Sequence, residues 1–62
     1  MEKDKQSFLE ALRINNGKVD EYTLGNALGF ADDKVKKIID VLVQEGKIEF
    51  QSFGLCSYKV KQ

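Results

Sequence analysis

The 62-residue sequence contains no histidine and no proline, and it has a single cysteine, Cys56. Without histidine it lacks the side chain most used in acid–base chemistry, and it carries neither a glycine-rich phosphate loop nor cysteines or carboxylates at metal-ligand spacing. The sequence therefore predicts no catalysis, no metal and no cofactor, and it indicates no small-molecule ligand. One cysteine cannot form an internal disulfide, so we expect Cys56 to be a small packed residue in a cytoplasmic protein.

Long apolar segments are also lacking. No apolar run approaches the roughly 18 residues that a membrane span needs, and residues 1–6 are charged, unlike the apolar stretch of a signal peptide. We therefore expect a protein that does not enter a membrane. The length predicts one domain over residues 1–62 with a small core of marginal stability, which leaves a homodimer or a protein partner open.

A charge excess is missing as well, because ten lysines and arginines balance ten aspartates and glutamates. The only positive excess lies in residues 47–62, which carry three lysines and one glutamate. A typical nucleic-acid-binding domain is clearly basic, since contacts to phosphates supply most of its affinity. The balance argues mildly against a strong DNA binder.

Because proline is absent, glycine and asparagine mark the breaks between elements. Apolar residues recur at helical spacing from about residue 5 to residue 15, and Asn15-Asn16-Gly17 predicts the end of this first helix. The apolar positions are Phe8, Leu9, Ala11, Leu12 and, as a further candidate, Ile14. A short second helix is predicted over residues 21–28, with Asp20 as its N-cap, Leu24 and Leu28 on one face, and Gly29 at its end.

A third helix is predicted over residues 32–45, because Val35, Ile38, Ile39 and Leu42 form one apolar stripe. Gly46 ends this helix. Residues 47–51 and 57–61 then alternate apolar and polar on either side of Ser52-Phe53-Gly54, which predicts a β-hairpin over residues 47–61.

This order of elements resembles the winged helix-turn-helix superfamily. The chain fits the family pattern "L-x-x-x-L-G-hydrophobic … V … L-x-x-x-G-x-I" at Leu24, Leu28, Gly29, Phe30, Val35, Ile39, Leu42, Gly46 and Ile48. The resemblance implies an α+β fold, a three-helix bundle with a C-terminal β-hairpin wing. It also implies a transcriptional regulator that binds double-stranded DNA, with the third helix in the major groove and the wing on the backbone.

Winged helices also serve as adaptors between proteins, and the matching residues are all structural, so an adaptor that does not bind DNA remains the alternative. The second half, from Val35-Lys36-Lys37-Ile38 to Tyr58, is also similar to the small winged-helix protein associated with dissimilatory sulfite reductase. Suggested roles of that family include DNA binding and an action on the reductase, and the second of these favours the adaptor.

Six lysines are the candidate DNA contacts. Measured around the third helix, Lys34, Lys37 and Val41 project away from the core and Lys36 lies on a flank, so the three lysines are expected to contact phosphates or guanine edges. On the other reading they form exposed ion pairs with nearby carboxylates, which contribute little. The wing adds Lys47, Lys59 and Lys61.

The third helix begins with two aspartates, Asp32 and Asp33, after Ala31, where the family commonly has a serine or threonine cap. Alanine is a poorer cap by about 1 kcal/mol. The aspartates can offset this loss by facing the positive end of the helix dipole, and Asp32 can cap in a shifted register. Their functional alternatives are repulsion of wrong DNA or a contact to a cytosine amino group.

Three apolar residues are candidates for an interface with a second copy or another protein. Phe53 and Leu55 flank Gly54 at the predicted wing tip, and Val41 is expected on the outer side of the third helix. Apolar residues gathered on a surface indicate an interaction site. The alternative is that the hairpin folds back and packs Phe53 or Leu55 onto its own core.

Overall fold

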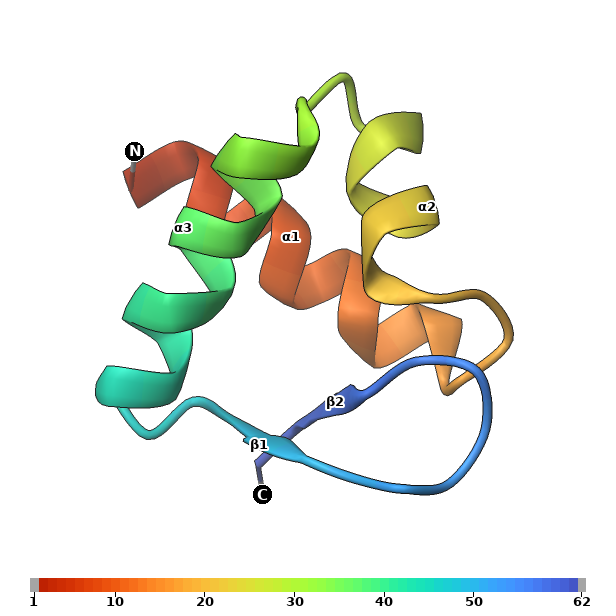
Figure 1. The fold of residues 1–62 in the computed structure, drawn as a ribbon. Helices are drawn as coiled ribbons and strands as arrows, with labels where there is room; N and C mark the ends of the chain where they lie inside the picture. The colour runs from red at the N-terminus through yellow and green to blue at the C-terminus, as the bar shows by residue number, and fades with distance from the viewer. Residues whose placement is uncertain (1, 62) are drawn as a thin grey trace.

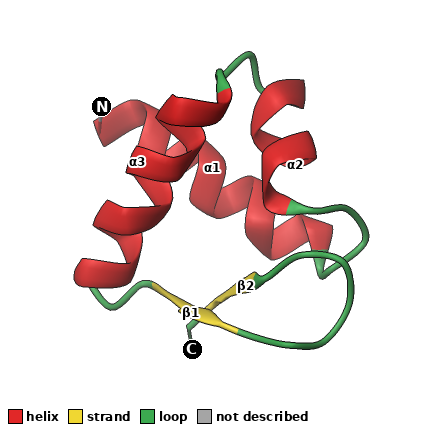
Figure 2. Ribbon diagram, in the orientation of Figure 1, coloured by secondary structure: helices red, strands yellow, loops and turns green. Residues whose placement is uncertain are grey.

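The computed structural model describes residues 2–61. Three helices, α1 (Glu2–Asn15), α2 (Glu21–Ala27) and α3 (Asp32–Gln44), precede two strands, β1 (Ile48–Phe50) and β2 (Tyr58–Val60). Helix α1 crosses behind α2 and α3, and the antiparallel hairpin closes the end of the bundle below them (Figures 1 and 2). The expected α+β order of three helices and a hairpin is confirmed, and the layout is like that of a winged helix.

Helix α1 begins three residues earlier than the sequence predicts, and Lys5, at the predicted start, belongs to its buried stripe. The buried residues of the helix are Lys5, Phe8, Leu12 and Asn15. The inclusion of Ile14 among the packed positions is wrong, because its side chain is 67% exposed. Ile14 follows the buried Leu12 by two residues, about 200° around the helix, and so faces the opposite side.

The link between α1 and α2 is held by side chains that bond to the backbone. Asn15 donates from Nδ2 to the carbonyl of Val19 at 2.9 Å and accepts the amide of Val19 at Oδ1 at 3.1 Å. Asp20 accepts the amides of Tyr22 and Thr23 at 3.1 and 3.2 Å, so its predicted role as the N-cap of α2 is confirmed.

Helices α2 and α3 approach closely at Gly25, which is buried within α2. A Cβ atom there would lie 2.2 Å from Cγ2 of Val35, so α3 occupies the place of the missing side chain. Gly29 then reverses the chain with a φ of 90°, as expected. Leu28 lies outside the helix as its C-cap and is 39% exposed, which corrects its predicted place on the packed face.

The core lies between the helices and the hairpin. Among residues 2–61 eight apolar side chains are buried, and half of them come from the predicted stripe of α3. The others are Phe8, Leu12, Ile48 and Cys56. The thiol of Cys56 is 3.2 Å from the carbonyl oxygen of Tyr58, and this confirms the expected packed role of the cysteine.

The two strands pair in the register Ile48↔Val60, Glu49↔Lys59 and Phe50↔Tyr58. Backbone bonds from Gln51 to Ser57 and from Lys61 to Lys47 extend this pairing over the predicted hairpin range.

The loop between the strands folds back onto the link between α1 and α2. The amide of Leu55 donates to the carbonyl of Gly17 at 3.0 Å, and the amide of Ser57 donates to Oε1 of Glu21 at 3.0 Å. A Cβ atom at Gly54 would lie 3.0 Å from the same Gly17 oxygen, so glycine permits this approach.

Candidate binding face

The outer side of α3 is an exposed surface on which lysines and aspartates are mixed. Six residues make up this surface, called here the α3 face: Asp33, Lys36, Lys37, Asp40, Val43 and Gln44. Lys36 pairs with Asp40 one helical turn later, at 3.4 Å. Two lysines and two aspartates therefore cancel within the α3 face, and the exposed Asp32, which lines one hollow with Asp33 and Lys36, adds a further negative charge beside it.

Lys34 and Val41 do not lie on this outer side, and their predicted placement there is corrected. Nζ of Lys34 is 2.6 Å from Oδ2 of Asp4 in α1 and 5.0 Å from the centre of the Phe30 ring. Val41 is half-buried and follows Lys34 by seven residues, so both lie on the stripe of α3 that turns towards α1. The hydrogen bond from Lys34 lowers the pKa of Asp4.

The two aspartates at the start of α3 both make local hydrogen bonds. Oδ1 of Asp32 accepts from Nδ2 of Asn26 in α2 at 3.1 Å, and Oδ1 of Asp33 accepts the amide of Lys34 at 2.9 Å. Ala31 is the N-cap and makes no side-chain capping bond. These contacts give the acidic pair a structural role at the helix start that does not depend on DNA.

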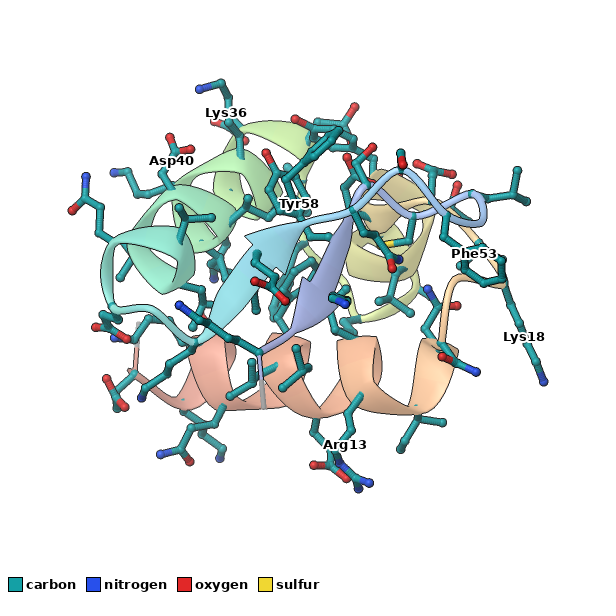
Figure 3. All side chains as sticks on the ribbon, turned by 90° about the horizontal axis from the view of Figure 1, so that it is seen from below. Arg13, Lys18, Lys36, Asp40, Phe53 and Tyr58 are labelled. Atoms are coloured by element: carbon teal, nitrogen blue, oxygen red, sulfur yellow. The ribbon has the colours of Figure 1, made fainter. Side chains whose placement is uncertain are left out.

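The wing lysines lie on a different side of the molecule from Lys36. Lys59 and Lys61 line a cleft between the hairpin and α1, together with Arg13. Figure 3 shows Lys36 and Arg13 on opposite sides of the hairpin. Lys59 is also paired with Glu49 across the strands, at 3.6 Å. The six candidate lysines therefore do not form one continuous basic surface.

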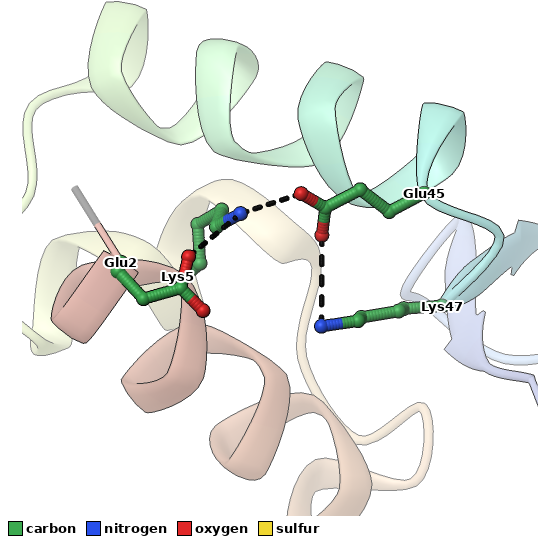
Figure 4. A network of polar contacts seen from close by, with 4 residues as sticks. All are labelled: Glu2, Lys5, Glu45 and Lys47. Atoms are coloured by element: carbon green, nitrogen blue, oxygen red, sulfur yellow. Dashed lines mark hydrogen bonds and ion pairs between the residues drawn. The ribbon is translucent and has the colours of Figure 1, made fainter.

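The remaining wing lysine, Lys47, belongs to a network that joins α1 to the end of α3 (Figure 4). Glu45 accepts from Nζ of Lys5 at 2.6 Å and lies 3.6 Å from Nζ of Lys47, while Lys5 also contacts Glu2 at 3.0 Å. The side chain of Lys5 is only 9% exposed. Its hydrogen bond to Glu45 lowers the pKa of that carboxyl and raises the pKa of Lys5.

An apolar group, called here the apolar cluster, adjoins the α3 face and shares Val43 with it. Its members are the exposed Val43 of α3, the exposed Phe50 of β1 and the half-buried Tyr58 of β2. Val43 is 44% and Phe50 is 70% exposed. The rings of Phe50 and Tyr58 meet edge to face with 6.2 Å between their centres, and all three residues line one shallow hollow together with Asp40 and Gln44. Tyr58, Lys36 and Asp40 lie on the same side of the molecule in Figure 3.

Sequence reasoning missed Val43 and Phe50. Phe50 shares the inward side of the strand with Ile48, so the period-two pattern assigns it to the core. It is the last residue of β1 and lies beyond the buried part of the sheet. The one available signal was the position of Phe50 at the end of a short strand.

Phe53 and Leu55 are exposed, as the interface prediction requires. The loop backbone folds back onto Gly17, but the two side chains remain 77% and 70% exposed. The alternative in which one of them packs onto the core is therefore wrong. Whether they bind a partner stays a prediction.

Within residues 2–61, no three or more acidic, cysteine or histidine side chains are placed to hold a metal ion. Every helix in the same range is too short or too polar to cross a lipid bilayer. Comparison with known proteins adds no identity: no family model, no curated protein and no solved structure matches this chain.

Proposed function

We propose that this domain is a winged-helix-like adaptor for protein–protein interaction, whose binding surface is the α3 face together with the apolar cluster. The observation that carries the proposal is the exposure of Val43 and Phe50, which line one hollow with the half-buried Tyr58, at the edge of a helix face that carries both lysines and aspartates. Exposed apolar patches rimmed by polar residues mark interaction sites, and aromatic residues are enriched at the centres of protein interfaces.

The arrangement of charge supports this function over the binding of duplex DNA. In a major groove the α3 face would bring Asp33 and Asp40 close to phosphates, together with Lys36 and Lys37. Each lysine that neutralised a phosphate would be offset by a carboxylate that repels one. Because the wing lysines lie beside α1, they add little positive charge to this surface.

A DNA-binding transcriptional regulator is the second candidate. It is favoured by the helix-turn-helix order and by Lys37, which is exposed and makes no ion pair with any residue from 2 to 61. This candidate requires an affinity that falls steeply as salt rises, since phosphate contacts release counterions. A cytoplasmic location belongs to both candidates and agrees with the buried free thiol of Cys56.

The adaptor function is tested by affinity enrichment from an extract of the source cells, with three baits. Phe50→Ser removes the largest exposed ring of the apolar cluster and leaves the core intact, so it is expected to lose the proteins that the parent retains. The matched control is Ile14→Ser, which removes an equally exposed apolar side chain from another hollow, beside Leu28. Equal retention by all three baits would contradict the proposal.

A further inference from the structure

We infer that the partner of the apolar cluster is a second copy of this chain, docked through a two-fold contact of the two clusters. The inference rests on the proposed protein-binding function and names its partner. In such a contact the same patch is used on both copies, and closed dimers of this kind are the commonest protein oligomers.

Charge complementarity favours a second copy over a strongly charged partner. The α3 face carries Lys36 and Lys37 together with Asp33 and Asp40, so its net charge is zero. A surface of one sign would repel its own copy, whereas this surface can place lysines of one copy near aspartates of the other. A strongly acidic or basic partner would meet no excess of the opposite charge on the α3 face.

The apolar cluster ends at Tyr58. Tyr58 borders the hollow that contains Val43 and Phe50, and it also borders the cleft that contains Phe53. Tyr58 is thus the one residue that borders both hollows, and the cleft beyond it is lined largely by polar and charged side chains. A two-fold axis near Phe50 would bury the cluster in both copies and bring the same ring into contact with its symmetry mate.

The size of the molecule determines how much of it such a contact covers. A standard interface buries about 800 Å² of each partner, and the described chain exposes 4131 Å² in all. With overall dimensions of 26 × 23 × 17 Å, a contact centred on Phe50 would extend over the neighbouring α3 face. The dimer would therefore cover the surface that a winged helix presents to DNA.

Few strongly exposed rings contribute to this contact, so the dimer is expected to be weak, with a dissociation constant on the order of 10–100 µM. Sedimentation velocity of the parent chain from about 10 µM to about 1 mM should then show a reversible shift from monomer to dimer. Phe50→Ser should raise the dissociation constant at least about tenfold. Ile14→Ser, the exposed apolar control, should leave it unchanged. Far-ultraviolet circular dichroism checks that both variants stay folded.

Amide chemical shifts over the same dilution series locate the contact. The inference expects concentration-dependent shifts at Val43, Gln44, Phe50 and Tyr58, and none at Ile14. A parent that stays monomeric to about 1 mM overturns the dimer, as does an effect of Ile14→Ser as large as that of Phe50→Ser. A monomer whose Phe50→Ser variant still loses its enriched proteins would leave the adaptor function standing with a different partner.

Discussion

Position 25 accommodates only glycine, because a methyl group of Val35 occupies the space that a side chain would need. The sequence places a glycine inside a short helix, where it costs about 1 kcal/mol relative to alanine. Glycine is nevertheless required in this helix, because a Cβ atom at position 25 would lie 2.2 Å from Cγ2 of Val35. Helix propensity and packing therefore make opposite predictions for the same substitution.

Gly25→Ala is expected to lower the free energy of unfolding by about 1–3 kcal/mol, because overpacking a tight contact outweighs the gain in helix propensity. Urea unfolding measures the change. In a Val35→Ala background the methyl group in the way is gone, so the same substitution should cost much less. A stabilising effect of Gly25→Ala in the parent would show that α2 and α3 do not pack this closely.

At the scale of elements, α1 and α3 are joined by a pair that no local pattern reveals. Lys5 of α1 and Glu45 at the end of α3 are forty residues apart and lie 2.6 Å from each other. Because the pKa of Glu45 is lowered in the folded state, its contribution to stability is present above the unfolded pKa of about 4.3 and is lost as the pH falls further. The raised pKa of Lys5 works in the opposite direction, and its contribution is lost only as the pH rises through the folded pKa of that lysine.

Glu45→Gln should therefore be less stable than the parent at pH 7 and should lose less stability between pH 7 and pH 3. Urea unfolding across this range measures both effects. The lowered pKa values of Asp4 and Asp20 act in the same direction and remain in the variant, so part of the acid sensitivity should persist. Identical pH profiles for parent and variant would show that the ion pair with Lys5 does not contribute.

The sequence predicts an element well where residues adjacent in sequence determine its structure. The stripe of α3, the Asp20 cap and the reversal at Gly29 each depend on a few adjacent residues, and all three are present. The burial of Lys5 depends on a distant carboxylate instead, since its ammonium group contacts Glu45. For Lys34 the decisive neighbour is Asp4, also far away in sequence.

The candidate site was less predictable than the fold for the same reason. At about 100° per residue, Lys34 and Lys36 lie on opposite flanks of the apolar stripe, and spacing alone does not say which flank turns towards α1. The placement of Lys34 and Val41 on the outer side was therefore wrong. Period-two alternation puts Phe50 on the same side of its strand as the buried Ile48, although Phe50 is exposed at the end of the strand. Phe53 and Leu55 flank the turn glycine Gly54 and are exposed, whereas the sequence pattern left open whether one of them packs onto the core.

At the scale of the whole molecule, equal numbers of positive and negative side chains are also evenly mixed in space. Four of the six candidate lysines have a carboxylate partner within 4 Å: Lys34, Lys36, Lys47 and Lys59. Exposed pairs of this kind add little stability, but they leave little unbalanced positive charge for a phosphate backbone. Together with the exposed apolar cluster, this balance is why the account assigns the α3 face to a protein partner.

The most direct test of that assignment is the affinity of labelled duplex DNA of random sequence at low and higher salt. We expect weak binding that is the same for the parent, for Lys36→Gln with Lys37→Gln, and for Asp32→Asn with Asp33→Asn. The asparagines keep a carbonyl oxygen for the bonds of the acidic pair, so the fold should lose only a few tenths of a kcal/mol of dipole interaction. Parent affinity that falls steeply with salt, is lost in the lysine variant and rises in the aspartate variant would contradict the account and place α3 in the major groove.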